Sequence, residues 1–442
     1  MEHMEERKPF FSISEDSEAV SFDSFVEEHG RLIGHYKLLG TLGIGGHGIV
    51  YLAQQQRPIR RMVALKIVRQ GLVSKNFLAR FDVEQQALAL LNHPNIAHVI
   101  DAGTTKAGRP YFVMEYLDGL SIVEYCDRYK LGLKDRLKLF IRVCEALHHA
   151  HRKGIVHRDI KPSNIIVCLQ EDQPVPKVID FGVAKATARP LSDLAHYTEP
   201  GQLIGTPEYM SPEQVQMNDQ DIDTRSDVYS LGVVLYQILT GTLPFDHETL
   251  RGHGFEHLRD IIGRQQPPTP SKRVAGLGSE AEKTADDRST DFKTLLRVLR
   301  KELEWIPLKA MRKERSRRYQ SAAELAHDIR NYLTGVPLIA GPESVIYRIR
   351  KFVNKRLEPF TAIAVVLALL ITNAIFLKLS IQTGKLYRAT GHAPTAEAEH
   401  SKANQTELNR PAEPPQPTDN SRLDKQMNTA VGQEMLREKS DN

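Results

Sequence analysis

Two stretches of the sequence carry residues suited to handling phosphate and protons. The first, LGTLGIGGHGIVYLA, places Gly43, Gly45 and Gly48 in a G-x-G-x-x-G pattern, with Val50 two residues later. Glycines at this spacing let the backbone approach a polyphosphate closely and offer it unobstructed N–H donors. Dinucleotide-binding folds and flexible hairpins show the same spacing, so the glycines alone are a weak signal. The second stretch, VHRDIKPSNIIV at 156–167, crowds a histidine, two basic residues, an acid and an amide between apolar runs.

The order of elements around the glycines separates the alternatives. A dinucleotide-binding fold needs a strand before the glycines and a helix directly after them, whereas here the strand-like IVYLA follows. The apolar strand MVALKIV then carries Lys66, and the helical stretch RFDVEQQALALL carries Glu84. An ion pair between these two side chains at a cleft would hold the ammonium where it meets phosphate oxygens.

Taken in chain order, the motifs resemble the signature of protein kinases. G-x-G-x-x-G-x-V, V-A-x-K, H-R-D-x-K-x-x-N and D-F-G follow one another, and the likeness continues through GTPEYMSPEQ, SDVYSLGVVLYQILTG and RSRRYQSA. The resemblance implies an α+β, bilobal protein-kinase fold. A kinase domain at 35–335 would then comprise a small β-rich N-lobe at about 36–115 and a larger helical C-lobe at about 118–333.

The resemblance also implies how the polar residues act. Asp159 would orient the acceptor hydroxyl and accept its proton, and Lys161 would neutralise the γ-phosphate during transfer. Asn164 and Asp180 would bind Mg²⁺, which prefers hard oxygen ligands. ATP is the implied phosphate donor. Its phosphates would meet Gly43, Gly45, Gly48 and Lys66, and its adenine would lie among Leu42, Val50, Ala64, Met114, Glu115, Leu117 and Ile166. Ordinary core packing explains the apolar members of this set equally well.

Finer features point to the class of substrate. DIKPSN and GTPEYMSPE resemble serine/threonine kinases, with Thr206 under the acceptor hydroxyl, contacting Asp159 and Lys161. By the same resemblance Asp227 would brace the catalytic loop, and Arg318 would pair with Glu213.

We also predict autophosphorylation between Gly182 and Ser211. The segment offers Ser192, Thr198 and Thr206, and phosphate on Thr198 would pair with Arg158.

Three functions fit the motifs to different degrees. An active protein kinase needs Lys66, Glu84, Asp159, Asn164 and Asp180, and all five are present. The alternative is a pseudokinase scaffold that binds nucleotide or partners, which would be free to lose any of them. A small-molecule kinase is disfavoured, because GTPEYMSPE resembles a platform for docking peptides.

Composition limits the partners and the compartment. A net charge of +4 over 442 residues gives no electrostatic case for nucleic-acid binding. The odd number and wide spacing of Cys126, Cys144 and Cys168 favour reduced thiols over a disulfide framework. Outside the kinase motifs, we expect a disordered acidic segment at 1–34, a surface insertion at about 264–291, a basic amphipathic segment at 343–356 and a disordered polar tail at 379–442.

One run is apolar enough to suggest a membrane. FTAIAVVLALLITNAIFL predicts a transmembrane helix at 360–378, and the chain most resembles the eukaryotic-like kinases of bacteria that carry such a helix after the kinase domain. The excess of Lys/Arg between Arg348 and Arg356 favours a single-pass inner-membrane protein with a cytoplasmic kinase, its basic segment on anionic lipid. Asn373 could bond between helices and favour a homodimer, or simply be tolerated facing lipid.

Overall fold

The computed structural model describes residues 29–45, 48–69, 85–86, 88–181, 206–216, 222–251 and 254–389, except for the side chains at 350, 352–366, 384 and 386–389. The chain divides into two units, Met1–Leu357 and Glu358–Asn442. The predicted disordered segment at 1–34 lies almost entirely outside the described residues, and so does the tail after 389.

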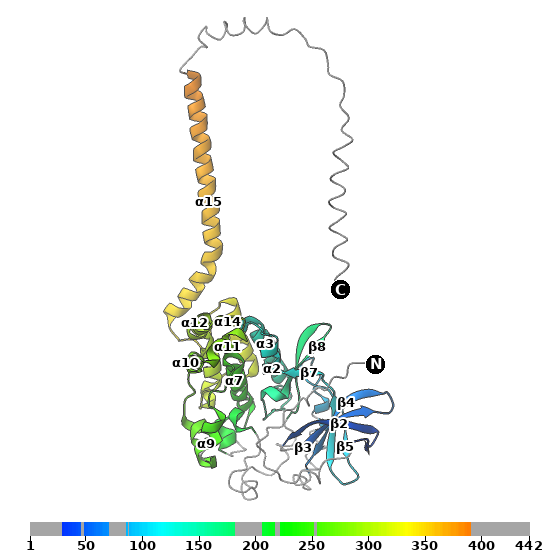
Figure 1. The fold of residues 1–442 in the computed structure, drawn as a ribbon. Helices are drawn as coiled ribbons and strands as arrows, with labels where there is room; N and C mark the ends of the chain where they lie inside the picture. Colours follow the sequence, from blue (N-terminus) through cyan, green and yellow to red (C-terminus); the bar gives the residue numbers. More distant parts are fainter. Residues whose placement is uncertain are drawn as a thin grey trace, which may run out of the picture. The chain divides into compact units, whose positions relative to one another are not determined.

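The first part of the chain forms a six-stranded antiparallel sheet (Figure 1). In sheet order its strands are β1 (Leu32–Ile33), β2 (Tyr36–Gly45), β3 (Gly48–Gln55), β4 (Arg61–Val68), β6 (Pro110–Glu115) and β5 (Val99–Thr104). Alternate residues of β3 are buried, as expected for a strand with one face on a core. The register places Lys66 of β4 opposite Val50 on one side and Phe112 on the other.

A second, three-stranded sheet follows the first in the sequence, and catalytic motifs flank two of its strands. Its order is β7 (Gly119–Ser121), β8 (Ile165–Gln170) and β9 (Gln173–Val178). The short helix η3 (Pro162–Asn164) directly precedes β8. Because β8 and β9 form a tight antiparallel pair, Asn164 and Asp180 lie at the same end of it, with Ile165 opposite Val178.

The remainder of the described chain is helical (Figure 1). The helices of this part are α2 (Ile122–Arg128), α3 (Leu133–His151), η4 (Pro207–Tyr209), α6 (Pro212–Val215), α7 (Thr224–Thr240), α8 (His247–Arg251), α9 (Gly254–Arg264), α10 (Pro270–Ala275), α11 (Glu280–Asp286), α12 (Phe292–Val298), the π-helical turn η6 (Leu299–Leu303), α13 (Trp305–Ala310), η7 (Arg315–Arg317) and α14 (Ala322–Thr334). The predicted β-rich lobe and larger helical lobe are confirmed.

Helix α7 is central to the helical lobe. It is buried on almost every side, from Ser226 to Thr240, which fits its largely apolar sequence. Gly232 allows α13 to approach closely, because a Cβ at that position would lie 2.7 Å from the Cβ of Ala310. The main core joins this helix to α3 and α14, and reaches the first lobe through Phe112 and Met114.

The segment 264–291, which we expected to be a surface insertion, forms two helices that are partly exposed and pack one side against the core. It forms α10 and α11 and buries Val274 and Ala285 almost completely. Arg288 is also buried, at 1% exposed, and donates to the carbonyls of Ile238, Leu239 and Thr284. Its charge suggested a solvent-exposed position, but the carbonyls at the C-terminal end of α7 replace water as hydrogen-bond partners.

Helix α15 (Val345–Ala389) ends the described chain. The start predicted for the disordered tail, residue 379, is therefore too early, because residues 379–389 continue this helix. They contain one glycine and no proline, so each added residue gains a backbone hydrogen bond. Over the residues whose side chains are described, no helix is both long and apolar enough to cross a membrane. Part of the predicted span at 360–378 lies outside those residues.

Candidate active site

The loop between α3 and β8 is held by one buried carboxylate. Asp227, in the first turn of α7 and 1% exposed, accepts hydrogen bonds from the backbone N–H groups of His157 and Arg158, each at 2.8 Å. Its Oδ2 also lies 2.8 Å from Nε2 of His151. Burial by itself would raise the pKa of Asp227, but these donors hold it below its usual value. The predicted brace is confirmed.

Arg158 shows why the loop needs a brace. Its φ is 64°, in the left-handed region that non-glycine residues seldom adopt. Its N–H is bonded to Asp227, and its carbonyl accepts from Nε2 of Gln214 at 2.8 Å. Hydrogen bonds on both sides of the residue offset an unfavourable backbone conformation that costs on the order of 1–3 kcal/mol.

His157 is fully buried and packs against the loop rather than facing outward. Its Nε2 lies 2.9 Å from the carbonyl oxygen of Ile179, and its ring centroid lies 4.7 Å from that of Phe181. Burial lowers its pKa, although Asp227 acts in the opposite direction. A neutral ring that donates from Nε2 fits these contacts, so His157 supports the loop and the residues before Phe181.

The polar residues of the loop converge on one another. Nζ of Lys161 lies 3.2 Å from Oδ2 of Asp159 and donates to Oγ1 of Thr206 at 3.3 Å. Nδ2 of Asn164 donates to the backbone oxygen of Asp159 at 2.7 Å and to its Oδ2 at 3.1 Å. Pro162 begins η3 and fixes the turn that buries Asn164. An acid, a cation and a hydroxyl are thus gathered where a hydroxyl acceptor could lose its proton.

Lys66 reaches this group from the first lobe. Its Nζ lies 2.6 Å from Oδ2 of Asp180, which follows β9 and also has a positive φ of 64°. The predicted partner, Glu84, lies outside the described residues, as do Gly182, Ser192 and Thr198. The carboxylate of Asp180 and the amide oxygen of Asn164 are the hard donors that Mg²⁺ prefers, so these two residues fit a magnesium ion.

The glycines of the G-x-G-x-x-G pattern lie on the antiparallel pair of β2 and β3. Gly43 and Gly45 lie on β2, and Gly48 begins β3 with a φ of 155°. A Cβ at Gly48 would collide with the carbonyl of Ile67, so only glycine fits there.

The predicted adenine residues come from both sheets and the segment between them: Leu42 lies on β2, Val50 on β3, Ala64 on β4, Met114 and Glu115 on β6, Ile166 on β8, and Leu117 between β6 and β7. Ala64 is opposite Met114 in the β4–β6 pair, and both are almost fully buried, as is Ile166 of β8. Leu42, Val50 and Leu117 are partly buried. The N–H of Glu115 donates to the carbonyl of His98, and its carboxylate binds Lys177 at 2.8 Å. The backbone N–H of Glu115 is therefore occupied, and its carbonyl oxygen is the backbone group that it can offer to adenine.

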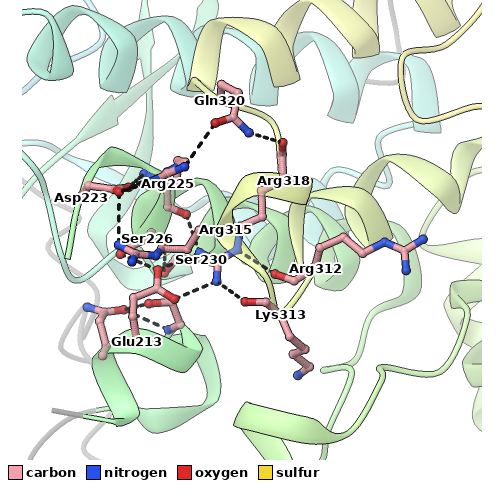
Figure 2. A network of polar contacts seen from close by, with 12 residues as sticks. Glu213, Asp223, Arg225, Ser226, Ser230, Arg312, Lys313, Arg315, Arg318 and Gln320 are labelled. Atoms are coloured by element: carbon pink, nitrogen blue, oxygen red, sulfur yellow. Dashed lines mark hydrogen bonds and ion pairs between the residues drawn. The ribbon is translucent and has the colours of Figure 1, made fainter. Parts of the chain in front are cut away.

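A buried ion pair fixes the segment after Thr206. Nη1 of Arg318 donates to Oε1 of Glu213 and Nη2 to Oε2, each at 2.7 Å. Figure 2 shows this pair and the groups around it. Ser226 donates to the same carboxylate at 2.6 Å, and Arg318 also donates to the carbonyls of Arg312, Lys313 and Arg225. Burial would raise the pKa of Glu213, but Arg318 holds it below its usual value. The predicted Glu213–Arg318 pair is confirmed.

Besides the Lys66–Asp180 pair, three contacts of the site were missed from the sequence. His151 is the last residue of α3, and its position just before the loop was the signal for its contact with Asp227. Gln214 follows the acid of the Glu213 pair, and Lys177 precedes the D-F-G motif by three residues. Gln214 ends the motif GTPEYMSPEQ but was given no role there, and Lys177 lies in none of the motifs; their partners are a backbone carbonyl and a distant strand.

The chain resembles known proteins in sequence over more than half of its length. Residues 36–305 match the family model described as protein kinase domain. The chain is 36% identical over 313 residues to the serine/threonine-protein kinase PknB of Mycobacterium leprae, covering 70% of this chain and 44% of PknB. It is 38% identical over 248 residues to the serine/threonine-protein kinase pkn3 of Myxococcus xanthus, covering 55% of this chain and 44% of pkn3. The crystal structure of the Mycobacterium tuberculosis PknI kinase domain aligns with a TM-score of 0.48 and 24% identity, covering 69% of this chain and 99% of that one. The chain spans less than half the length of the curated relatives it matches.

Proposed function

This chain belongs to the protein kinase family and carries a serine/threonine protein kinase domain, and we propose that it transfers the γ-phosphate of ATP to serine and threonine hydroxyls of proteins. The observation that carries this proposal is the convergence of Asp159, Lys161 and Asn164 on a braced loop, with Lys66 paired to Asp180 beside it. A scaffold without activity has no need for this arrangement.

Each residue has a distinct part in the proposed transfer. Asp159 accepts a hydrogen bond from the acceptor hydroxyl and then takes its proton as the phosphate arrives. Lys161, 3.2 Å from that carboxylate, offsets the charge on the transferred group. Asn164 and Asp180 would hold Mg²⁺, which neutralises charge on the phosphates. Lys66 contacts the phosphates while its ion pair to Asp180 fixes its position, and Thr206 sits against Lys161 near the acceptor.

The apolar residues of the cleft complete the ATP site in this proposal. Leu42, Val50, Ala64 and Ile166 enclose the adenine, Met114 lies behind it, and the backbone of Glu115 and Leu117 bonds its edge. Glu84 is proposed as a further partner of Lys66 in the active enzyme, and autophosphorylation between residues 182 and 211 as a means of ordering that segment.

We further propose that residues 360–378 anchor the protein in the inner membrane with the kinase domain in the cytoplasm. The eighteen uncharged residues from Phe360 to Leu377 support this, and so does the exposure of the large apolar side chains described between Leu367 and Ile381. Lys and Arg residues are concentrated before the span, which favours that side remaining in the cytoplasm. A homodimer through Asn373 stays a prediction.

The test is phosphate transfer by the full chain. Purified protein is incubated with Mg-ATP labelled on the γ-phosphate and a generic protein substrate, and the modified residues are identified by mass spectrometry. We expect phosphoserine and phosphothreonine in the substrate, and far less of both with Asp159→Asn. ATP binding without any transfer would favour the pseudokinase scaffold instead, and transfer to small molecules alone would refute a protein kinase.

A further inference from the structure

Four exposed basic side chains line an open hollow on the helical lobe, away from the catalytic loop. Lys293 and Arg297 of α12 and Arg300 and Lys301 of η6 surround it, with Leu296 among them. Their spacing along the helix brings them to one face. The stretch FKTLLRVLRK from 292 to 301 contains no acid, so the hollow concentrates four positive charges. We call these four residues the basic face.

The acid that follows the basic face is already neutralised. Glu302 is buried, and its Oε2 lies 2.5 Å from Nζ of Lys351 in the second turn of α15. The ring of Tyr347 packs edge-on against that of Trp305, with centroids 5.8 Å apart, and its hydroxyl accepts from the N–H of Leu338 at 3.2 Å. The first two turns of α15 are therefore fixed to the lobe through η6 and α13, the elements next to the basic face.

These turns expose apolar side chains. Val345, Ile346 and Ile349 are 67%, 78% and 57% exposed, and Arg348 between them is exposed as well. An apolar group flanked by cations is the combination that binds an anionic bilayer surface, where charge attracts headgroups and apolar side chains enter the interface. A purely acidic protein or a nucleic acid would leave the apolar group in water.

We propose that the basic face and the exposed side chains of residues 345–349 form one surface that lies on anionic lipid headgroups. This inference rests on the proposed membrane anchor, because residues 345–351 directly precede the predicted span and keep the surface close to the bilayer. The contacts of Lys351 and Tyr347 attach the first turns of α15 to the kinase domain, so the exposed apolar side chains and the basic face belong to the same unit.

The only tryptophan of the chain is a natural probe of this contact, because Trp305 lies beside η6. The full chain is reconstituted in vesicles that contain a dansyl lipid, either with phosphatidylcholine alone or with phosphatidylglycerol added. We expect energy transfer from Trp305 to the dansyl groups to rise by about twofold with the anionic lipid, and high salt to reverse the rise.

A matched pair of variants isolates the basic face. The first replaces Lys293, Arg297, Arg300 and Lys301 by Gln, and the second replaces four exposed cations elsewhere, Lys37, Lys106, Lys134 and Arg152, by Gln. We expect the rise to vanish in the first variant and to persist in the second, with both keeping the parent's activity toward a soluble peptide. Equal transfer in the two lipids for the parent, or an undiminished rise in the first variant, would overturn the inference.

Failure of the anchor is distinguishable from failure of this surface. Retention of the chain in phosphatidylcholine vesicles after alkaline extraction reports the anchor alone. The chain could instead be extracted from the vesicles and still show more energy transfer with anionic lipid. If the first variant lacks that increase, the result refutes the anchor and supports the basic face. Binding of soluble polyglutamate by the parent but not by the first variant, without any response to lipid, would instead indicate an acidic protein partner and refute the inference.

Discussion

Nζ of Lys66 lies 2.6 Å from Oδ2 of Asp180, and this ion pair joins strand β4 to the residues that follow β9. The two side chains are 16% and 24% exposed, so water screens their attraction only in part. Each charge fixes the position of the other, and the pair lies beside the group formed by Asp159, Lys161 and Asn164. The residues proposed to contact phosphate, metal and hydroxyl are thus arranged together.

The two aspartates of the site should differ in their effects on catalysis. Asp159→Asn removes the proton acceptor, so we expect turnover to fall by roughly 10²–10⁴-fold while binding of Mg-ATP stays near the parent value. Asp180→Asn removes a magnesium ligand and should weaken Mg-ATP binding as well. Steady-state kinetics and nucleotide titration measure both quantities. A turnover loss below about tenfold for Asp159→Asn would contradict its assignment as the base.

Asp227 should act on turnover by positioning the loop. Asp227→Asn replaces one acceptor oxygen by a donor, although the site presents donors from His151, His157 and Arg158. We expect kcat to fall by about 10- to 100-fold with little change in the KM for ATP, because the loop moves while the nucleotide pocket stays. The control is Asp223→Asn, which keeps an acceptor at the N-cap of the same helix. An equal loss of kcat in the control would show that the brace has no special role.

The Glu213–Arg318 pair should matter for stability. Arg318→Met leaves a buried carboxylate without its partner, and we expect it to lower the free energy of unfolding by about 3–5 kcal/mol. Glu213→Gln combined with Arg318→Met should recover part of this loss. Arg317→Met is the matched control, since that side chain is 73% exposed and its pair with Glu314 is superficial. Urea unfolding measures the differences, and similar losses in the two single variants would refute the expectation.

Stability should fall in mild acid because of one buried and two partly buried histidines. Burial lowers the pKa of His157 in the folded protein, and the same cause lowers those of His148 and His149. As the pH falls below about 6.5, the unfolded chain therefore takes up protons before the folded protein does. Each histidine then lowers the free energy of unfolding by up to about 1.4 kcal/mol per pH unit. Stability should be complete above that pH and decline below it. In His157→Asn the decline between pH 7.5 and pH 5.5, as measured by urea unfolding, should be shallower; an unchanged slope would show that His157 does not contribute.

Proteolysis tests the proposed topology. Protease added to intact spheroplasts should trim only the residues after about 379, because the kinase domain is protected in the cytoplasm. Permeabilised cells provide the control, in which the kinase domain should also be cut. Digestion of the kinase domain in intact spheroplasts, or release of the protein by high salt, would show that the anchor or its orientation is wrong.

The sequence by itself determined the family and the order of the lobes, and it supplied the catalytic residues that we propose. Phosphate binding and proton transfer require fixed residue types at short spacings, such as Asp159, Lys161 and Asn164 within six positions. The apolar run of β3 and the apolar character of α7 are also local features, and these are visible in a single sequence.

Only the tertiary structure decided which distant groups meet. Lys66 and Asp180 are 114 residues apart, and Gln214 reaches the carbonyl of Arg158 across 56 residues. The partial burial of 264–291 was missed for a related reason. Its charge and prolines resemble a surface loop, and the carbonyls at the end of α7 that accept from Arg288 become partners only after the chain has folded. Local patterns report what a residue can do, whereas long-range packing sets the partners that replace water around it.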